Sequence, residues 1–406
     1  MAEYGYVEMP DKVAGNSRKV SIVGIGESDY HDDYRAERAK AEGYESPTFE
    51  ELGQLALERA LADAGLKPDA IDGLALSFTF GGPDPDILLP ATGLKPKEVW
   101  QNGHIMAGPL PAACGKILTG EHDTIAMLFT LANRSSGRVF GGMTFASGMG
   151  GPFSYYYFHP WGWSSQAAHW ALMASRYMAQ YGYREEDLGA VPQQVREHAS
   201  RTPQAVMQKP FTIQEYMASP YIVNPMHLYD ICLRNDGAVC LILTGADRAR
   251  DMAKTPVDVA GWGESYIKAD KMRTMVEDRV MPQMAEAGAQ ALSMAGLSID
   301  EIGHLEGYDA GSMHLVNHVE GFGFCPPGEG IRFCQDGQLA QGGRIPTNTA
   351  GGNMSGSYMQ GWSQIAEAVR QLRHEAGERQ IEGLQASLTC LAQTDAAHPI
   401  VFTRGN

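Results

Sequence analysis

The sequence predicts an α/β protein built from two similar halves, each with a mostly parallel sheet. Its 406 residues exceed what one hydrophobic core usually supports, so two packed units are expected. An internal repeat is the stronger evidence: VSIVGIGES at 20–28 recurs as VDVAGWGES at 257–265, and ALADAGLKPDAIDGLAL at 60–76 recurs as ALSMAGLSIDEIGHLEG at 291–307. Strands buried on both faces are predicted for the apolar runs VSIVGI, TIAMLF, VCLILT and PIVFTR.

Each copy of the repeat is expected to contain a strand, a helix and a second strand. The helix should end at Gly65 in the first copy and at Gly296 in the second, because glycine readily takes the left-handed conformation that closes a helix. Leu66 and Leu297 follow these glycines and can pack back on the last helical turn. The same local signals therefore predict the same supersecondary unit twice.

The repeat divides the chain into an N-terminal half at 1–250 and a C-terminal half at 251–406. Within the first half, the stretch at about 141–224 is unusual. It begins with glycines mixed with Tyr155, Tyr156, Tyr157, Phe158, Trp161 and Trp163. Such a mixture suits a pocket for a bulky apolar substrate and equally suits packing in the core or at a dimer interface, and both interpretations stay open. The following QAAHWALMASRYMAQYG predicts a helix.

Composition and charge narrow the function classes. The chain has 44% hydrophobic and 20% charged residues and a formal charge of −16, which disfavours binding to nucleic acid or to anionic membranes. Six cysteines without a CxxC pair are expected to be free thiols. The N-terminal stretch has no signal-peptide pattern, no run approaches the ~18 apolar residues of a membrane span, and the final RGN is not a peroxisomal signal of the SKL type. We therefore expect a cytoplasmic protein.

A series of local motifs carries a family resemblance along nearly the whole chain. They are VGIGES, NG-x-x-x-A-G before GKILTGEHDTIAML, NDGAVCLIL, EGYDAGS, GFCPPGEG and NTAGGNMSGSYMQGW. In this order they resemble the sterol-carrier-protein-2 (SCP2) type thiolases. The resemblance implies the α/β thiolase fold, with two βαβαβαββ halves in five layers (α-β-α-β-α), an inserted loop domain and a homodimer.

The first catalytic loop departs from thiolases. Thiolases place a nucleophilic cysteine at a helix N-terminus, where the thiolate is favoured. The resemblance puts Gly103 at that position, and a register slip of a few residues would offer His104 or Met106. Cys114 lies about three helical turns downstream, roughly 16 Å away, and is expected to be a buried helix residue. The chain cannot be an ordinary thiolase.

The other catalytic loops have gained tyrosines. The family pattern GGxxSxGHPxG is matched from Gly351 and Gly352 onward, and Tyr358 stands where the family has its histidine. The loop that reads HDCF or NEAF in relatives is here YDAG, which begins with Tyr308 and Asp309. Cys390 in SLTCLAQT is the candidate for the family's C-terminal base.

This pattern resembles the thiolase-like aldolases of steroid side-chain degradation, a branch of lipid metabolism. The resemblance implies a carbon–carbon lyase that cleaves a β-hydroxy acyl-CoA to a ketone and a shortened acyl-CoA, such as propionyl-CoA or acetyl-CoA, with tyrosine as acid and base. The candidate catalytic residues are Tyr358, then Tyr308, then Tyr266. Alternatives are a Cys-independent acyltransferase or condensing enzyme, and a non-catalytic pseudo-thiolase that binds lipid or acyl-CoA. The expected oxyanion and substrate-binding residues are Gly103, His104, Asp309, Gly351, Gly352 and Cys390.

The resemblance also implies a partner. These aldolases depend on a small DUF35 protein with a zinc ribbon and an OB-fold, which together with a homodimer implies a heterotetramer. The chain has no CxxC…CxxC of its own for zinc. His314 and His318 have a metal-compatible spacing without an evident third ligand, and GIGES at 24–28 lacks the third glycine of a dinucleotide fingerprint. We expect no metal and no permanently bound cofactor, with a CoA thioester as substrate.

Overall fold

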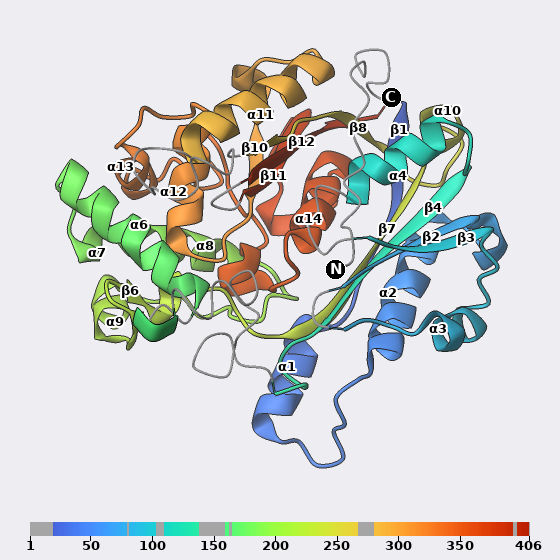
Figure 1. The fold of residues 1–406 in the computed structure, drawn as a ribbon, viewed down its shortest axis with the longest axis horizontal. Helices are drawn as coiled ribbons and strands as arrows, with labels where there is room; N and C mark the ends of the chain where they lie inside the picture. Colours follow the sequence, from blue (N-terminus) through green and yellow to red (C-terminus); the bar gives the residue numbers. More distant parts are fainter. Residues whose placement is uncertain are drawn as a thin grey trace.

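The computed structural model describes residues 19–78, 81–102, 109–137, 159–161, 165–266, 280–392 and 396–405. The described strands follow one hydrogen-bonded path in the order β10-β11-β12-β8-β1-β7-β4-β2-β3, with β9 beside β12 and a separate β5-β6 hairpin. Helices lie on both sides of this path (Figure 1). The predicted α/β fold class is confirmed.

The N-terminal half has the order βαβαβαββ. Its strands are β1 (Val20–Glu27), β2 (Gly73–Phe78), β3 (Glu98–Asn102), β4 (Thr124–Ala132) and β7 (Asp236–Gly245). Its helices are α1 (Tyr30–Ala39), α2 (Phe49–Ala64), α3 (Pro85–Thr92), α4 (Pro109–Leu118) and α10 (Ala246–Ala249), with a 3₁₀ turn at η1 (Pro68–Ala70). β2 is parallel to β3 and β4, whereas β7 is antiparallel to β1 and β4. The prediction of a mostly parallel sheet is therefore wrong for this half, because β7 adds antiparallel pairings on both of its sides.

The C-terminal half repeats this topology. Its strands are β8 (Val257–Trp262), β9 (Ser265–Tyr266), β10 (His304–Gly307), β11 (Ala386–Ala392) and β12 (Ala396–Arg404). Its helical segments are α11 (Val280–Ala295), η5 (Ile299–Glu301), α12 (Ser312–Gly321), α13 (Gly330–Gln335), η6 (Gly352–Gly356), α14 (Trp362–Arg373) and η7 (Gly377–Arg379). β10 is parallel to β11, and β12 is antiparallel to β11 and β8.

Within the described residues, the second half lacks a full counterpart of strand β3. The strand equivalent to β3 is reduced in the second half to a single bridge between Leu305 and Thr347. Pro346 precedes Thr347 and has no N–H to extend the ladder. β1 and β8 meet edge to edge over Ser21 and Ile22, which joins the two half-sheets into one path.

The repeated glycines explain why each helix lies so close to its strand. A Cβ on Gly24 or Gly26 of β1 would lie 2.4 or 2.0 Å from a carbonyl oxygen of α2. Gly261 in β8 and Gly263 just after it stand in the same relation to α11, at 2.2 and 1.9 Å. Only glycine permits this approach. The predicted helix ends are confirmed too, because the residues after α2 and α11, at 65 and 296, have φ of +68° and +69°.

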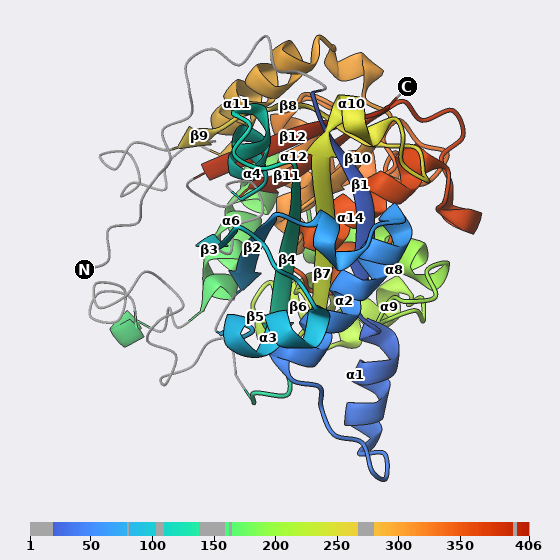
Figure 2. The same ribbon diagram turned by 90° about the vertical axis from the view of Figure 1, so that its right-hand side faces the viewer.

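The layers follow from the alternation of side chains along the strands. In β7, Cys240 packs with α2, whereas its neighbours Val239 and Leu241 pack in the core that contains α4 and α14. α14 contacts strands of both halves. Figures 1 and 2 both place the strands of the second half between α14 and α11. The order α2, strands, α4 with α14, strands, α11 is the α-β-α-β-α arrangement of the thiolase fold.

The described part of the insertion between β4 and β7 is mostly helical. It contains η2 (His159–Trp161), α6 (Gln166–Tyr181), α7 (Glu185–Leu188), α8 (Ala190–Ser200), α9 (Ile213–Ala218), β5 (Tyr221–Val223), β6 (Met226–His227) and η3 (Leu228–Asp230). α6 confirms the predicted helix. Of the aromatic residues singled out above, Trp161 is 85% exposed, and the others lie outside the described residues. The division of the chain at residue 250 stays a prediction.

Among the described residues, no helix combines the length and the apolar character needed to cross a membrane.

Candidate active site

Tyr308 and Tyr358 meet although 50 residues separate them along the chain. Their hydroxyl oxygens are 3.3 Å apart, and both side chains are buried. Tyr308 follows β10, and its N–H donates to the carbonyl of Cys390 in β11 at 2.8 Å. The N–H of Tyr358 donates to Oδ1 of Asn235 at 2.7 Å. Hydrogen bonds from their backbone N–H groups to Cys390 and to Asn235 therefore help to bring Tyr308 and Tyr358 into one site.

Asp309 holds the loop that carries Tyr358. Its Oδ1 accepts hydrogen bonds from the backbone N–H and the Nδ2 of Asn353, at 2.7 and 3.0 Å. Its Oδ2 accepts from the N–H of Met354 at 3.3 Å, and Nε2 of Gln364 adds a further contact at 3.2 Å to Oδ1. The sequence predicts a substrate-binding Asp309, but in the structure both of its oxygens are engaged by its own protein. Asp309 thus holds this loop in place, and its predicted contact with substrate stays a prediction.

Gly351 and Gly352 are required by the shape of this loop. Their φ angles of +92° and +51° are left-handed, and a π-helical turn follows over Gly352–Gly356. A Cβ on Gly352 would lie 2.3 Å from Oδ2 of Asp309, and one on Gly351 would lie 2.6 Å from the Cβ of Ala199 in α8. These glycines allow close packing, whereas their predicted contact with an oxyanion stays a prediction.

Burial dominates the electrostatics of the tyrosine pair. It raises the pKa of Tyr358 to about 12, with the nearby Cys232 acting in the same direction. Hydrogen bonds from Tyr308 and from Gln360 oppose that increase. Burial raises the pKa of Tyr308 well above its usual value, and the neighbouring Tyr358 adds to the effect. Burial therefore disfavours the phenolate form of both tyrosines.

Burial shifts two further ionisable groups beside the pair towards their neutral forms. Burial raises the pKa of the Asp309 carboxyl to about 8. Burial lowers the pKa of His314 to about 3, and its ring meets Tyr308 edge to face, with centroids 5.6 Å apart. His318 lies one turn further along α12, where burial lowers its pKa to about 4. No group of three His, Cys, Asp or Glu side chains that could hold a metal ion occurs among the described residues.

The structure gives other predicted site residues different surroundings. Tyr266 in β9 is 48% exposed, its hydroxyl bonds to Glu264, and its ring contacts His398 at a centroid distance of 5.2 Å. Neither of these contacts involves Tyr308 or Tyr358. Gly103 and His104 lie outside the described residues, as does Met106.

The two cysteines discussed above are both buried. Cys114 lies in α4 with no exposed surface, which confirms the prediction of a buried helix residue. Cys390 lies in β11, where burial raises the pKa of its thiol well above the usual value. A thiol of this kind stays protonated at neutral pH and is a poor base. Cys390 contributes its backbone carbonyl, which fixes Tyr308.

Three further residues contribute to the site and were not among the predicted ones. Asn235 anchors the backbone of Tyr358, Gln360 donates from Nε2 to the Tyr358 hydroxyl at 3.3 Å, and Cys232 lies beside both tyrosines. Asn235 and Cys232 belong to the segment that enters β7, where the N–H of Cys232 donates to the carbonyl of Ala310 at 3.0 Å. Asn235 lies in the NDGAVCLIL motif and Gln360 in NTAGGNMSGSYMQGW, but neither motif attaches a chemical role to these residues, and Cys232 lies outside both motifs.

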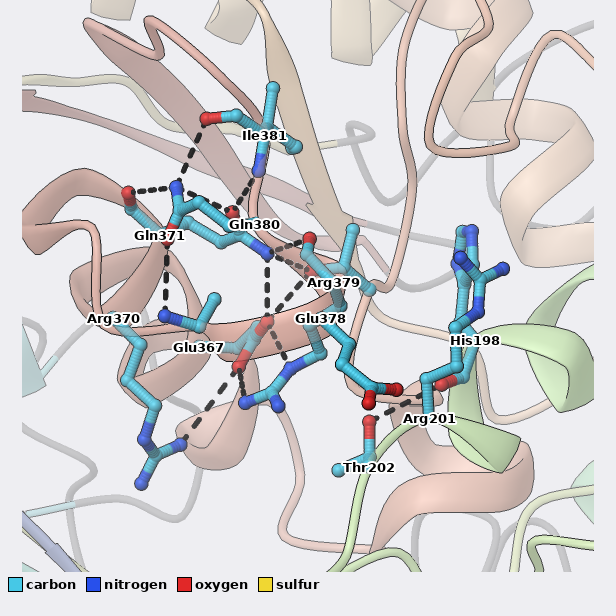
Figure 3. Close-up of polar contacts among 12 residues, drawn as sticks. His198, Arg201, Thr202, Glu367, Arg370, Gln371, Glu378, Arg379, Gln380 and Ile381 are labelled. Carbon is cyan, nitrogen blue, oxygen red and sulfur yellow. Dashed lines mark hydrogen bonds and ion pairs between the residues drawn. The ribbon is translucent and has the colours of Figure 1, made fainter.

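A buried ionic network supports the loop from α14 (Figure 3). Glu367 accepts two hydrogen bonds from Arg379, each 2.8 Å long, and one from Gln371 at 3.1 Å. Arg370 is paired with Glu27 of β1. The network borders a cleft that is also lined by Gly352, Gly356 and Ser357 and by neither tyrosine of the pair. The pair of Arg370 and Glu27 links α14 of the second half to β1 of the first.

Comparisons with known proteins identify the family of this chain. Residues 265–394 match the model described as thiolase C-terminal domain-like. The 17-hydroxy-3-oxo-4-pregnene-20-carboxyl-CoA lyase of Mycobacterium tuberculosis is 32% identical over 88% of this chain and 92% of its own length. The steroid side-chain-cleaving aldolase of Thermomonospora curvata is 33% identical over 79% and 85%. The chain belongs to the SCP2-type thiolase-like family that includes these enzymes.

A solved structure agrees with this assignment. The Ltp2-ChsH2(DUF35) aldolase superimposes with a TM-score of 0.82 at 28% identity, over 96% of this chain and 99% of the other. The family assignment thus confirms the resemblance stated from the motifs, including the fold class.

Proposed function

We propose that this protein is an acyl-CoA aldolase, a carbon–carbon lyase on a thiolase fold that works without a nucleophilic cysteine. The observation that carries the proposal is the buried contact between Tyr308 and Tyr358, at 3.3 Å, in the loops where thiolases keep catalytic side chains. Relatives of 32% and 33% identity that are named lyase and aldolase support it. Cys390 and Cys114 are too deeply buried to act as effective nucleophiles.

The chemistry is a retro-aldol cleavage. One phenol, as its phenolate, removes the proton from the β-hydroxyl, the Cα–Cβ bond breaks, and a ketone and a thioester enolate form. The other phenol supplies a proton to Cα of the enolate. The proton lost by the hydroxyl replaces the proton delivered to Cα, so that the reaction needs no redox cofactor and no permanently bound group.

The substrate we propose is a β-hydroxy acyl-CoA with a steroid-like tail, cleaved to a ketone and a short acyl-CoA such as propionyl-CoA or acetyl-CoA. The names of the two relatives support the steroid class. We further propose a homodimer that binds a DUF35 protein with an OB-fold and a zinc ribbon, giving a heterotetramer. The similarity to the Ltp2-ChsH2(DUF35) aldolase supports the DUF35 partner.

Product analysis tests this function. The chain would be co-expressed with a DUF35 protein encoded in the same genome, and a steroid-tailed β-hydroxy acyl-CoA would be added. Ketone and shortened acyl-CoA are expected, and Tyr358→Phe should reduce turnover roughly 10²- to 10⁴-fold. Tyr221→Phe is the matched control, because Tyr221 is 49% exposed on the β5-β6 hairpin.

Two outcomes would favour other functions. Transfer of the acyl group to a second acceptor, without formation of ketone, would indicate a condensing enzyme or acyltransferase. Tight binding of substrate with no product from either the wild-type protein or its variants would indicate a non-catalytic acyl-CoA-binding subunit.

A further inference from the structure

Gln360 has an unusual backbone conformation for its residue type. Its φ is +50°, and only four described residues other than glycine have a positive φ. Two of them, Lys40 and His374, close the helices α1 and α14, where a left-handed residue is common. Asn348 belongs to the type that tolerates this region best. Gln360 neither closes a helix nor belongs to a residue type that tolerates positive φ well. An unfavourable backbone conformation is therefore retained next to the candidate site.

The side chain of Gln360 points at the reacting groups. Its Nε2 donates a hydrogen bond to the hydroxyl of Tyr358 at 3.3 Å, and the hydroxyl of Tyr308 lies 3.3 Å from the same oxygen. An amide nitrogen can only donate, whereas a phenol oxygen can accept two hydrogen bonds. If Tyr308 donates as well, two donors converge on the oxygen of Tyr358.

We propose that Gln360 is a positioning residue that makes Tyr358 the base of the pair and Tyr308 the proton donor. Two donors stabilise negative charge on the Tyr358 oxygen, whereas Tyr308 acts as one of these donors and receives neither hydrogen bond. This assignment rests on the aldolase function proposed above. It adds the direction of proton transfer, which the presence of two tyrosines leaves open.

The surroundings of the pair are consistent with one phenolate. Cys232 from the segment before β7 faces both phenols, Asp309 follows Tyr308, and His314 faces Tyr308 from α12. Burial keeps the Cys232 thiol protonated, the carboxyl has a pKa of about 8, and the imidazole is neutral. Gln360 donates to the Tyr358 oxygen, and once Tyr358 is a phenolate the hydroxyl of Tyr308 must be the donor in their 3.3 Å contact, so both groups stabilise a negative charge on Tyr358.

The proton transfers then balance over one catalytic cycle without a co-reactant. The phenolate of Tyr358 takes the β-hydroxyl proton, the electrons of the broken Cα–Cβ bond form the enolate, and Tyr308 protonates Cα. The proton on Tyr358 returns to Tyr308 across their 3.3 Å contact, which restores the starting state.

Three substitutions distinguish the effect of the Gln360 side chain from the effect of its backbone conformation. Gln360→Gly removes the amide and relieves the left-handed conformation, Gln360→Leu removes only the amide, and Gln360→Asn keeps an amide that is too short to reach. Ionisation of Tyr358 would be followed by ¹³C NMR of protein labelled at tyrosine Cζ, with Tyr358→Phe identifying the signal. The pH profile of kcat/KM would be measured in parallel.

We expect the pKa of Tyr358 to rise by about one unit in all three variants, and kcat/KM at pH 7 to fall about tenfold, since one pKa unit is a tenfold change in phenolate. Gln360→Gly should be at least as stable as the wild type while being slower, which a purely structural role would not produce.

A fall or no change in the Tyr358 pKa in Gln360→Leu would overturn the proposal, because it would mean that the amide does not donate to this oxygen. First ionisation at Tyr308 would overturn it as well. The NMR titration needs no turnover, so the absence of aldolase activity in the wild type would count against the proposed function and leave this assignment to be judged by the titration.

Discussion

Substitution of Gly352 by alanine tests whether the fit between the loop and Asp309 sets the geometry of the site. The new Cβ would lie 2.3 Å from Oδ2 of Asp309 and 2.5 Å from Nδ2 of Asn348, well inside normal contact distance. Both groups are buried, so the carboxyl must move and lose its bond from the N–H of Met354. The residue would also keep a left-handed φ of +51°.

The expected magnitude follows from these two effects. A left-handed alanine costs about 1–2 kcal/mol. Loss of the buried hydrogen bond of Asp309 costs about 1–3 kcal/mol. Together they predict a decrease of about 2–5 kcal/mol in the free energy of unfolding. Because Tyr358 lies in the same loop, kcat/KM should fall as well.

Gly182→Ala is the matched control. Gly182 ends α6 with φ of +77°, and a Cβ there would meet nothing within 4 Å. It should cost only the conformational strain of about 1–2 kcal/mol and leave kcat/KM unchanged. Urea denaturation and steady-state kinetics would compare the two variants. Equal losses of stability, together with normal activity in Gly352→Ala, would refute the argument that this glycine sets the position of Asp309 and the loop.

Other predictions concern the chemistry of the pair and its neighbours. Tyr308→Phe and Tyr358→Phe should each lower kcat roughly 10²- to 10⁴-fold, and the double variant should be little worse than the slower single one, because the phenols act as a unit; additive losses in the double-mutant cycle would contradict this. The raised pKa of Asp309 means that the folded state binds a proton between about pH 4 and pH 8 that the unfolded chain has lost, so its contribution to stability is fully present below pH 4 and is lost as the pH rises to about 8. Asp309→Asn should therefore flatten the pH dependence of the unfolding free energy over this window, and an unchanged slope would show that the group is ionised. Cys390→Ala should retain most activity, since its contact with Tyr308 uses the backbone; loss comparable to that of Tyr358→Phe would restore the thiol as a catalytic base.

The fold was predictable because its signals are local and occur twice. Gly24 and Gly26 are spaced for close contact with one helix, and the same pair recurs at Gly261 and Gly263. The reduced third strand of the second half was not predictable, since it depends on how Thr347 meets Leu305 across a long connection.

The candidate site was predictable only in part. The motifs identified Tyr308 and Tyr358, because each stands at a definite position of a catalytic loop. They could not identify Asn235, which contacts Tyr358 from 123 residues away. For Asp309 the predicted contact with substrate stays a prediction, and sequence spacing does not reveal that its Oδ1 accepts two hydrogen bonds from Asn353.

The most direct measurement of the central claim is cleavage in D₂O, followed by mass spectrometry of both the products and the intact protein. A retro-aldol reaction without a nucleophilic cysteine should give a ketone and a short acyl-CoA with one deuterium at Cα. The protein mass should show no acyl adduct at any stage of turnover. An acyl-enzyme adduct, or release of a short acyl-CoA without ketone, would contradict a Cys-independent retro-aldol reaction at the tyrosine pair.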